Sequence, residues 1–310
     1  MRDLITGGAG FIGSHLVDAY LNRGDEVLVL DDLSSGKMTN LDHPDSKKFK
    51  FLKFDIRSEN LEQIVQEFKP DLISHHAAQK SVKDSVSDPF NDSSINITGT
   101  IRLLEACRKM NQPRILFASS GGTVYGVQDF FPADETHPLR PVAPYAVSKV
   151  SAEFYLNYYC SEWGFSATVL RYGNVYGPRQ DPKGEAGVVA IFCEALLKSA
   201  PCKIFGDGTQ TRDFIYIDDI VSANLAAEKT LKGFQIFNVC SDSEANVQKI
   251  YALVDGAAGA GRKPIYEDAR KGDLHRVGIS SKAFQSKTGW KPKVSLAEGI
   301  NSTWKWFKTC

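Results

Sequence analysis

The first half of the chain alternates short apolar runs with amphipathic stretches of helical period. This alternation is typical of parallel strands that are joined by crossover helices. The apolar runs predict strands over residues 4–5, 26–30, 49–54, 71–74, 114–118 and 167–170. The amphipathic stretches predict helices over residues 11–21, 61–68, 89–110 and 145–163.

The rhythm breaks after Arg171, where glycine, proline and charged residues dominate residues 172–187 and indicate loops over a cleft. The rest predicts helices over 188–197 and 220–231, strands over 214–217 and 235–239, and short helices within 264–310. We expect an α/β fold with a Rossmann-type, doubly wound parallel sheet in residues 1–173, which the strand near 235–239 rejoins. Residues 174–310 are expected to form a smaller C-terminal α/β lobe that is interleaved with it.

Composition narrows the class of protein. The 310 residues include 37 basic and 37 acidic side chains, so nucleic acid and membrane partners are not expected on electrostatic grounds. The six cysteines form no CxxC pair and no cluster with metal-ligand spacing, which predicts reduced thiols and no metal site. A first strand at Leu4 leaves no room for a signal peptide, and no apolar run approaches the roughly 20 residues that span a bilayer, so a cytoplasmic location is expected.

The glycine-rich turn after the first strand predicts a dinucleotide site. Gly7, Gly10 and Gly13 have the spacing that permits a tight turn, close approach of a pyrophosphate and close helix–strand packing. The phosphates would meet the N-terminus of the following helix at Phe11 and Ile12. Asp31-Asp32 ends the second strand, where a carboxylate binds ribose hydroxyls and repels a 2′-phosphate, which favours NAD over NADP.

Tyr145 and Lys149 indicate what is done with the dinucleotide. Residues four apart share one face of a helix, so both side chains can point into one cleft. Free tyrosine has a pKa of about 10, and use as a base at neutral pH needs a drop of roughly 3 units, about 4 kcal/mol. A neighbouring ammonium and an oxidised nicotinamide both favour the phenolate, and Lys149 can also hold the nicotinamide ribose.

A third element follows the fifth strand, in the segment Ser119 to Gly126. The carboxyl ends of parallel strands are where such folds bind ligands. A hydroxyl from this segment, such as that of Ser119 or Ser120, can therefore hydrogen-bond the reacting alcohol or ketone.

Taken together, these segments resemble the extended short-chain dehydrogenase/reductase family, and within it the nucleotide-sugar 4-epimerases, over nearly the whole chain. The matching motifs are residues 7–13, 76–79, 145–149, 170–179, 212–219 and 270–273. The resemblance implies these cofactor contacts: Asp31 (ribose), Asp55 and Ile56 (adenine), Ala77 and Ala78 (groove), Lys80 (pyrophosphate), Asn96 (cofactor site) and Tyr172 (nicotinamide). It implies these substrate contacts: Asn174, Arg212 and Arg270 (diphosphate), Asp273 (uridine ribose), and Val189 and Phe205 (uracil pocket).

Two departures from the family pattern matter. Gly121 stands where the family commonly has a serine or threonine, so Ser120 is the first choice for the catalytic hydroxyl and Thr123 the second. Val277 replaces a bulky tyrosine of glucose-restricted members, which leaves room beside carbon 2 of the sugar and suggests that N-acetylhexosamines are tolerated. His76 replaces an expected aliphatic residue without a functional account.

The resemblance implies NAD-dependent 4-epimerisation of a UDP-hexose, UDP-glucose/UDP-galactose with the N-acetylhexosamines as further candidates, through a transient 4-keto intermediate. The alternatives are a uronic acid epimerase, a 4,6-dehydratase or decarboxylase, and a non-enzymatic NAD-sensing protein. A dehydratase of this family would carry Asp-Glu at Gly121-Gly122, and a sensor would not need the Tyr145/Lys149 pair.

The two long predicted helices, 89–110 and 145–163, offer apolar faces formed by Ile95, Leu103, Leu104, Phe154 and Tyr158. In this family such helices pair across a two-fold axis. The resemblance therefore implies a homodimer.

Overall fold

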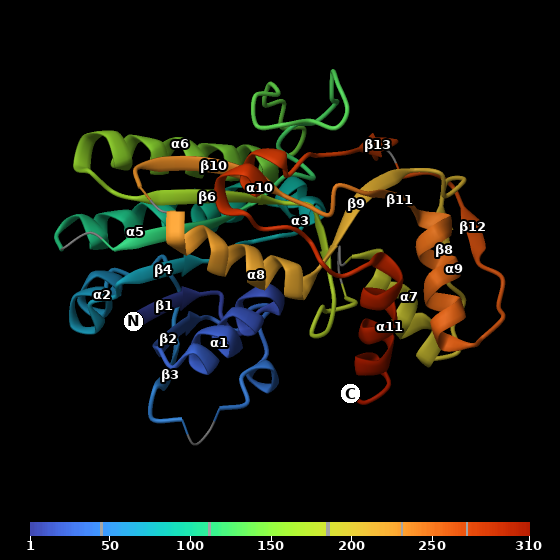
Figure 1. Cartoon of the computed structure of the whole chain (residues 1–310), viewed down its shortest axis with the longest axis horizontal. Helices are drawn as coiled ribbons and strands as arrows, with labels where there is room; N and C mark the ends of the chain where they lie inside the picture. Colours follow the sequence, from blue (N-terminus) through green and yellow to red (C-terminus); the bar gives the residue numbers. More distant parts are fainter. Residues whose placement is uncertain (44–45, 111–112, 184–186, 231, 271) are drawn as a thin grey trace.

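The computed structural model describes residues 1–43, 46–110, 113–183, 187–230, 232–270 and 272–310. Its centre is a parallel sheet with the strand order β3-β2-β1-β4-β5-β6-β10 (Figure 1). The strands are β1 (Arg2–Thr6), β2 (Glu26–Asp31), β3 (Phe49–Lys53), β4 (Leu72–His75), β5 (Arg114–Ser120), β6 (Ala167–Tyr172) and β10 (Phe234–Val239). The predicted doubly wound α/β fold is confirmed, and β10 pairs in parallel with β6 at the sheet edge.

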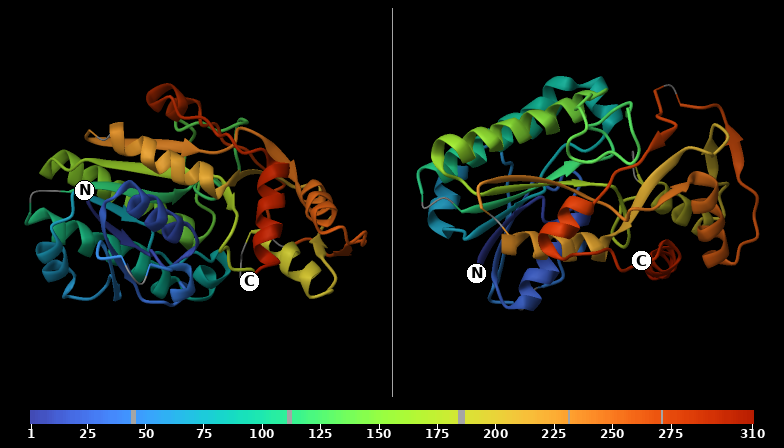
Figure 2. Two further views of the ribbon diagram at one scale, coloured as in Figure 1. Left: turned by 60° about the horizontal axis from the view of Figure 1, so that its bottom comes forward. Right: turned by 45° about the horizontal axis from the view of Figure 1, so that its top comes forward.

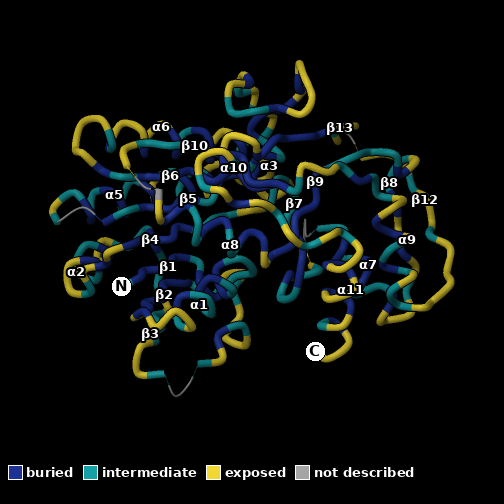
Figure 3. The backbone as a smooth tube through the Cα atoms, in the orientation of Figure 1, coloured by how far each residue is buried: buried dark blue, intermediate teal, exposed yellow. Residues whose placement is uncertain are grey.

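Helices cover both faces of this sheet (Figure 2). One face carries α1 (Phe11–Arg23) and α8 (Ile217–Ala227), and the other carries α2 (Leu61–Phe68), α5 (Gly99–Arg108) and α6 (Pro144–Trp163). Successive strand residues point to opposite faces, so Ile5 joins the apolar cluster under α1 while Leu4 joins the cluster under α5 and α6. Both faces are therefore buried, which explains why the strands read as continuous apolar runs (Figure 3).

The predicted helix over 89–110 is interrupted. It consists of α4 (Pro89–Ser93), a π-helical turn (Ser94–Thr98) and α5, and it ends at Arg108. Pro89 lies in the first turn as predicted, where its missing N–H costs nothing. Single π turns are frequent at functional sites, and this one contains Asn96. One extra residue in a single turn hardly changes the spacing of apolar residues, so the sequence pattern predicted one continuous helix over 89–110.

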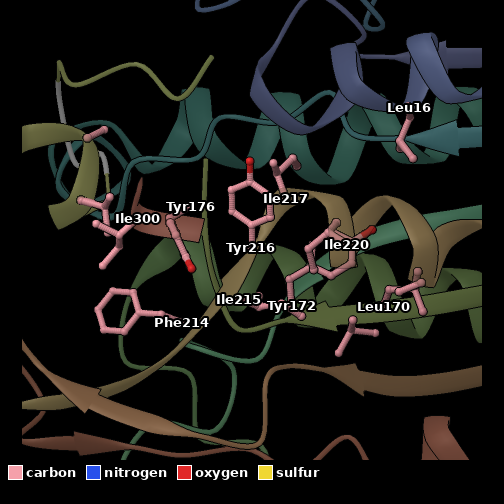
Figure 4. Packing of buried hydrophobic residues seen from close by; sticks show 14 of the residues in the cluster. Leu16, Leu170, Tyr172, Tyr176, Phe214, Ile215, Tyr216, Ile217, Ile220 and Ile300 are labelled. Carbon is pink, nitrogen blue, oxygen red and sulfur yellow. The ribbon is translucent and has the colours of Figure 1, made fainter. Parts of the chain in front are cut away.

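The smaller lobe contains one sheet of β7 (Asn174–Tyr176), β9 (Thr211–Tyr216), β11 (Glu244–Asn246) and β13 (Arg276–Val277), and a pair of β8 (Lys203–Phe205) with β12 (Ile265–Glu267). Its helices are α7 (Val188–Leu197), α9 (Val247–Ala258) and α11 (Leu296–Phe307). Side chains of β7, β9 and α11 join those of β6 and α1 in one continuous apolar cluster (Figure 4). The lobe thus shares its core with one face of the main sheet.

Several predicted bounds in this half are wrong. The strand predicted over 214–217 begins at Thr211, and α8 begins at Ile217 rather than residue 220, because Tyr216 is the extended residue that precedes it. The predicted end of that helix, Leu231, lies outside the described residues. The tail predicted as short helices, α10 (Lys282–Thr288) and α11, also holds β12 and β13, which are too short to show a period of two.

Shorter elements complete the description: α3 (Val82–Ser87) and single 3-10 turns η1 (Met38–Asn40) and η3 (Glu228–Thr230). Among the described residues, no helix has the length and apolarity that a membrane crossing needs.

Candidate functional site

The glycine-rich turn connects β1 to α1 and leaves no space for side chains on its inner side. Gly7 has a φ of +71°, and a Cβ there would lie 2.6 Å from the backbone nitrogen of Ala77. A Cβ on Gly13 would lie 2.2 Å from the Gly7 carbonyl oxygen. Gly10 precedes α1 and no side chain in the described part of the chain caps the helix, so the first N–H groups of α1 remain available to an anion.

Asp31 fastens this turn from the end of β2. Its carboxylate accepts hydrogen bonds from the backbone N–H of Ala9 at 2.9 Å and of Leu33 at 2.8 Å. Burial raises the pKa of Asp31, and these two bonds act against that rise. Each carboxylate oxygen keeps a lone pair for a ribose hydroxyl. Asp32 beside it is half-buried and accepts hydrogen bonds from Ser34.

The two residues predicted near adenine, Asp55 and Ile56, have different surroundings. Asp55 forms an ion pair with Arg57 at 2.6 Å, and this bond lowers the pKa of the carboxyl. Ile56 is buried and packs where a Cβ on Gly99 would meet its Cδ1 at 2.5 Å. Asp55 therefore has a partner of its own, and any adenine contact would come from its remaining lone pairs or its backbone.

A hydrogen-bonded chain through His75 fixes the wall that holds Ala77 and Ala78. The Thr100 hydroxyl donates to the Asn96 carbonyl at 2.7 Å, so it accepts from His75 Nε2 at 3.0 Å. His75 Nδ1 then accepts from the Thr6 hydroxyl at 2.6 Å, which in turn accepts from the Ala77 N–H at 3.2 Å. Burial lowers the pKa of His75 to about 3, which agrees with this neutral ring.

Asn96 anchors the other end of the wall. Its side-chain amide pairs with both backbone groups of Gln79: the Gln79 N–H donates to Oδ1, and Nδ2 donates to the Gln79 carbonyl, each at 3.0 Å. The segment that carries Ala77, Ala78 and Lys80 is thereby tied to the π turn. Lys80 lines the cavity described below.

Tyr145 and Lys149 lie on the first two turns of α6, as their spacing predicts. Lys149 Nζ is 5.9 Å from the Tyr145 ring centre and donates to the Ala118 carbonyl of β5 at 3.0 Å. Burial lowers the pKa of Lys149 to about 8. Burial raises the pKa of Tyr145 to about 12, and the Asp92 carboxylate acts in the same direction. The expected lowering of the Tyr145 pKa is therefore not seen, because burial and Asp92 outweigh the hydrogen bond from Ser120, which acts to lower it.

The two candidate hydroxyls differ in their surroundings. Ser120 forms a hydrogen bond with Tyr145 that favours the phenolate and lowers its pKa. The Thr123 hydroxyl is buried and has no hydrogen-bond partner among the described residues. A Cβ on Gly121 would lie 2.5 Å from Ile279 Cδ1, which gives a packing reason for glycine at this position.

A cavity of about 550 Å³ runs from the glycine turn to the smaller lobe. Phe11, Ile12 and Tyr145 line one end, and Phe205, Arg212 and Arg270 line the other. The predicted Asn174 and Asp273 also line it, as does Gln180, which the sequence interpretation missed. The cofactor turn, the tyrosine and the two arginines thus share one continuous space.

The substrate-side residues contact each other. Arg212 pairs with Asp273 at 2.5 Å, and the Arg270 guanidinium lies 4.0 Å above the Phe205 ring centre. Lys271, which belongs to the Arg270–Asp273 motif, lies outside the described residues. The Val189 side chain is fully buried in the core and its neighbour Val188 lines the cavity instead. Val277 is buried beside Arg212 in the β13–β9 register and is not among the residues that line the cavity.

The structure explains what the unexpected histidine at position 76 contacts. Its ring stacks on Tyr172 with an interplanar angle of 18°, and burial lowers the pKa of His76 to about 4. The Tyr172 hydroxyl is held by Asn224 of α8 at 2.9 Å. The histidine is therefore a neutral, flat surface behind the residue predicted to flank the nicotinamide.

Two buried groups near Lys149 were also missed. Glu153, one turn further along α6, pairs with Arg171 of β6 at 2.5 Å and accepts from the Ser119 hydroxyl at 2.6 Å. Asp92 lies fully buried on α4. The i+4 spacing from Lys149 to Glu153 could have indicated the first, whereas no local pattern indicates that Asp92 faces α6.

The parallel sheet, its glycine turn and the cavity lined by Tyr145 define an α/β protein built to bind a dinucleotide beside an ionisable phenol. The chain belongs to the NAD dependent epimerase/dehydratase family, which residues 4–240 match. This confirms the resemblance and NAD as the cofactor.

Individual relatives are similar over their full length. The "UDP-glucose 4-epimerase" of Mycolicibacterium smegmatis is 46% identical over 309 residues, 99% of each chain. The structure of the Thermotoga maritima UDP-glucose 4-epimerase with UDP-glucose has a TM-score of 0.96 and 42% identity, and covers 100% of this chain and 99% of that one. The UDP-N-acetylglucosamine 4-epimerase of Methanobrevibacter ruminantium, in complex with UDP-N-acetylmuramic acid, has a TM-score of 0.94 and 34% identity, and covers 99% and 98%.

Proposed function

We propose that this protein is an NAD-dependent 4-epimerase that interconverts UDP-glucose and UDP-galactose through a transient 4-keto sugar. The observation that carries the proposal is the single cavity that joins the glycine turn, Tyr145 and the two arginines. Family membership and the 4-epimerases among the similar proteins support it.

The chain's own residues fit NAD. The turn at Gly7, Gly10 and Gly13 has no room for side chains, and the N-terminus of α1 offers unpaired N–H groups to the pyrophosphate. The proposed contacts further along the groove are Asp31, Asp32, Asp55, Ile56, Ala77, Ala78, Lys80, Asn96, Lys149 and Tyr172. Bound NAD supplies a hydride acceptor and, when oxidised, a positive charge beside the reacting carbon.

Tyr145 is proposed as the group that takes the proton from the 4-hydroxyl and later returns it. Since burial raises its pKa to about 12, further positive charge must favour the phenolate, and an oxidised nicotinamide would supply it beside Lys149, whose Nζ lies 5.9 Å from the Tyr145 ring centre. Ser120 is proposed to hydrogen-bond the same oxygen, because it already contacts Tyr145.

Arg212 and Arg270 are proposed to hold the diphosphate, with Asn174 beside them. Asp273 would then exchange its bond to Arg212 for one to the uridine ribose, and Phe205 would contact uracil. Binding through the nucleotide leaves the sugar free to turn, so that either face of the 4-ketone can receive hydride.

The test is to incubate the NAD-loaded protein with UDP-galactose and follow the 4-epimer by NMR. Formation of UDP-glucose by the parent and its loss in Tyr145→Phe are expected. Absence of any 4-epimer from the parent protein would sink the proposal.

N-acetylated substrates are a finer proposal. Val277 pairs with Arg212 in the β13–β9 register and is smaller than the tyrosine that the family resemblance associates with glucose-restricted members, and one similar protein is a UDP-N-acetylglucosamine 4-epimerase. We expect turnover of UDP-N-acetylgalactosamine by the parent, and its selective loss in Val277→Tyr while UDP-galactose turnover remains. If the parent protein turns over none of the N-acetylated substrates, the proposal on N-acetylhexosamines is wrong, while the proposal on UDP-galactose is unaffected.

We also propose that residues 1–173 form the NAD-binding domain and that residues 174–310 form mainly the sugar-nucleotide lobe. The cofactor turn and Tyr145 belong to the first, and both arginines to the second. A cytoplasmic location is part of the proposal, supported by the six free cysteines, five of them buried or half-buried.

A homodimer is proposed on the outer face of α6. Phe154, Tyr155 and Tyr158 are exposed there, as are Val86 of α3 and Phe90 of α4. Exposed aromatic clusters of this kind mark interaction surfaces. The expected contribution of Leu103 and Leu104 is wrong, because both are buried against the sheet.

A further inference from the structure

Asp92 is a buried carboxylate whose partners are both neutral. It lies on α4, is fully buried, accepts from the Ser148 hydroxyl at 2.5 Å and accepts from Asn96 Nδ2 at 3.0 Å. A buried carboxylate is costly unless it is compensated. Two neutral hydrogen bonds satisfy its oxygens, but no ion pair with Asp92 is found among the described residues.

The two partners connect Asp92 to both halves of the cofactor site. Ser148 lies between Tyr145 and Lys149 in the sequence of α6. Asn96 holds both backbone groups of Gln79, in the segment that carries Ala77 and Ala78. One carboxylate therefore ties the helix of the phenol to the wall of the cofactor groove.

The charges around Lys149 show what Asp92 balances. Glu153 of α6 is compensated by Arg171 of β6 at 2.5 Å. His75 and His76, on the β4 side, are held neutral because burial lowers their pKa values. Asp92 is thus the negative charge near Lys149 that no described ion pair neutralises. It acts to raise the pKa of Lys149, against burial, and to raise that of Tyr145.

We propose that Asp92 is a positioning residue that tethers α6 to the Asn96 turn through Ser148 and serves as the buried counter-charge that keeps Lys149 an ammonium ion. This inference rests on the proposed roles of Tyr145 and Lys149.

The first test is Asp92→Asn, which keeps the shape and removes the charge. The pH profile of kcat/KM for UDP-galactose is expected to move to lower pH on both limbs, because Tyr145 and Lys149 each lose protons more readily. Ultraviolet difference titration of phenolate, relative to a Tyr145→Phe background, is expected to show the same shift of Tyr145 without any turnover. If both the pH profile of kcat/KM and the phenolate titration of Tyr145 are the same as in the parent, the proposed role of Asp92 as a counter-charge is wrong.

The matched control is Asp88→Asn, which removes an exposed carboxylate at the N-cap of the same helix. Asparagine caps as well as aspartate does, so no pH shift is expected. Asp92→Glu retains the charge and is expected to restore the parental profile. An equal shift in Asp88→Asn, or no rescue by Asp92→Glu, would contradict the inference.

Ser148→Ala tests the tether, and it remains informative if Asp92→Asn does not fold. It is expected to increase the NAD dissociation constant several-fold, measured by quenching of tryptophan fluorescence, with little movement of the pH profile. An unchanged dissociation constant would overturn the tether.

The two proposals can fail separately. If Tyr145→Phe epimerises as fast as the parent, the proposed catalytic roles are wrong. If Tyr145→Phe is inactive and Asp92→Asn keeps the parental pH profile, only the inference about Asp92 is wrong.

Discussion

At the residue scale, burial acts in opposite directions on the two side chains of the Tyr-x-x-x-Lys pair. It lowers the pKa of Lys149 to about 8 and raises that of Tyr145 to about 12, because each side chain avoids its charged form away from water. The pair was predictable from spacing alone, but these directions depend on how deeply α6 and β5 bury it. Charged groups nearby then shift the pKa of each side chain further, and so decide whether it can give up or take a proton near neutral pH.

The two hydroxyl candidates have different surroundings, so their substitution is expected to have different effects. Ser120→Ala is expected to lower kcat on the order of 10²-fold, because a positioned proton-transfer partner typically contributes 10²–10⁴-fold. Thr123→Ala is expected to leave kcat within a few-fold of the parent, since its hydroxyl contacts no described polar group. Steady-state kinetics on UDP-galactose measures both, and a larger loss in Thr123→Ala would reverse the assignment.

Asp3 gives a pH dependence of stability. It is fully buried on β1 and its Oδ2 lies 3.6 Å from the Arg23 guanidinium. Burial raises its pKa to about 7, with Asp25 and Glu228 acting in the same direction and Arg23 against it. The folded pKa exceeds the unfolded value of about 4, so the folded state binds the extra proton and loses stability as pH rises from about 4 through 7. Asp3→Asn is expected to flatten this loss in urea unfolding at pH 5 and pH 8. A steeper loss than in the parent would contradict it.

At the element scale, buried polar bonds join α6 to its neighbours. Arg171 of β6 pairs with Glu153 of α6 and also donates to the Tyr125 hydroxyl at 3.0 Å. Apolar periodicity predicted α6 and β6 as separate elements with correct bounds to within two residues. It did not indicate this pair, because the partners lie 18 residues apart and meet only when the strand and helix pack.

Removing one partner of this pair leaves the other charge buried. Arg171→Met is expected to lower the free energy of unfolding by about 3–5 kcal/mol. The double variant Arg171→Met/Glu153→Met is expected to recover part of the loss, since it removes both charges. Urea denaturation of the two variants measures this, and a double variant less stable than Arg171→Met would argue against it.

At the scale of the whole molecule, the exposed face of α6 makes the proposed homodimer testable. Phe154→Glu places a charge in the centre of the apolar face and is expected to give a monomeric mass by light scattering, where the parent gives a dimer. Ile265→Glu, on exposed β12 of the smaller lobe, is the control and is expected to leave the dimer intact. A monomeric parent protein would refute the proposal.

The sequence alone was enough to predict the seven strands of the main sheet, the helices α1, α2 and α6, the dinucleotide turn and the Tyr145/Lys149 pair. These features are local: glycine spacing, apolar periodicity and an i, i+4 relation are written within a few residues. The matching motifs also led to the family, which the match over residues 4–240 confirms.

The tertiary structure alone decided how distant residues meet. Asp92 reaches Ser148 across 56 positions, and the two-residue strand β13 sets Val277 beside Arg212. The depth of burial around Tyr145, and hence the direction of its pKa, is likewise a product of packing. Such features depend on which faces of the elements are pressed together, and that is settled by the core as a whole rather than by any one segment.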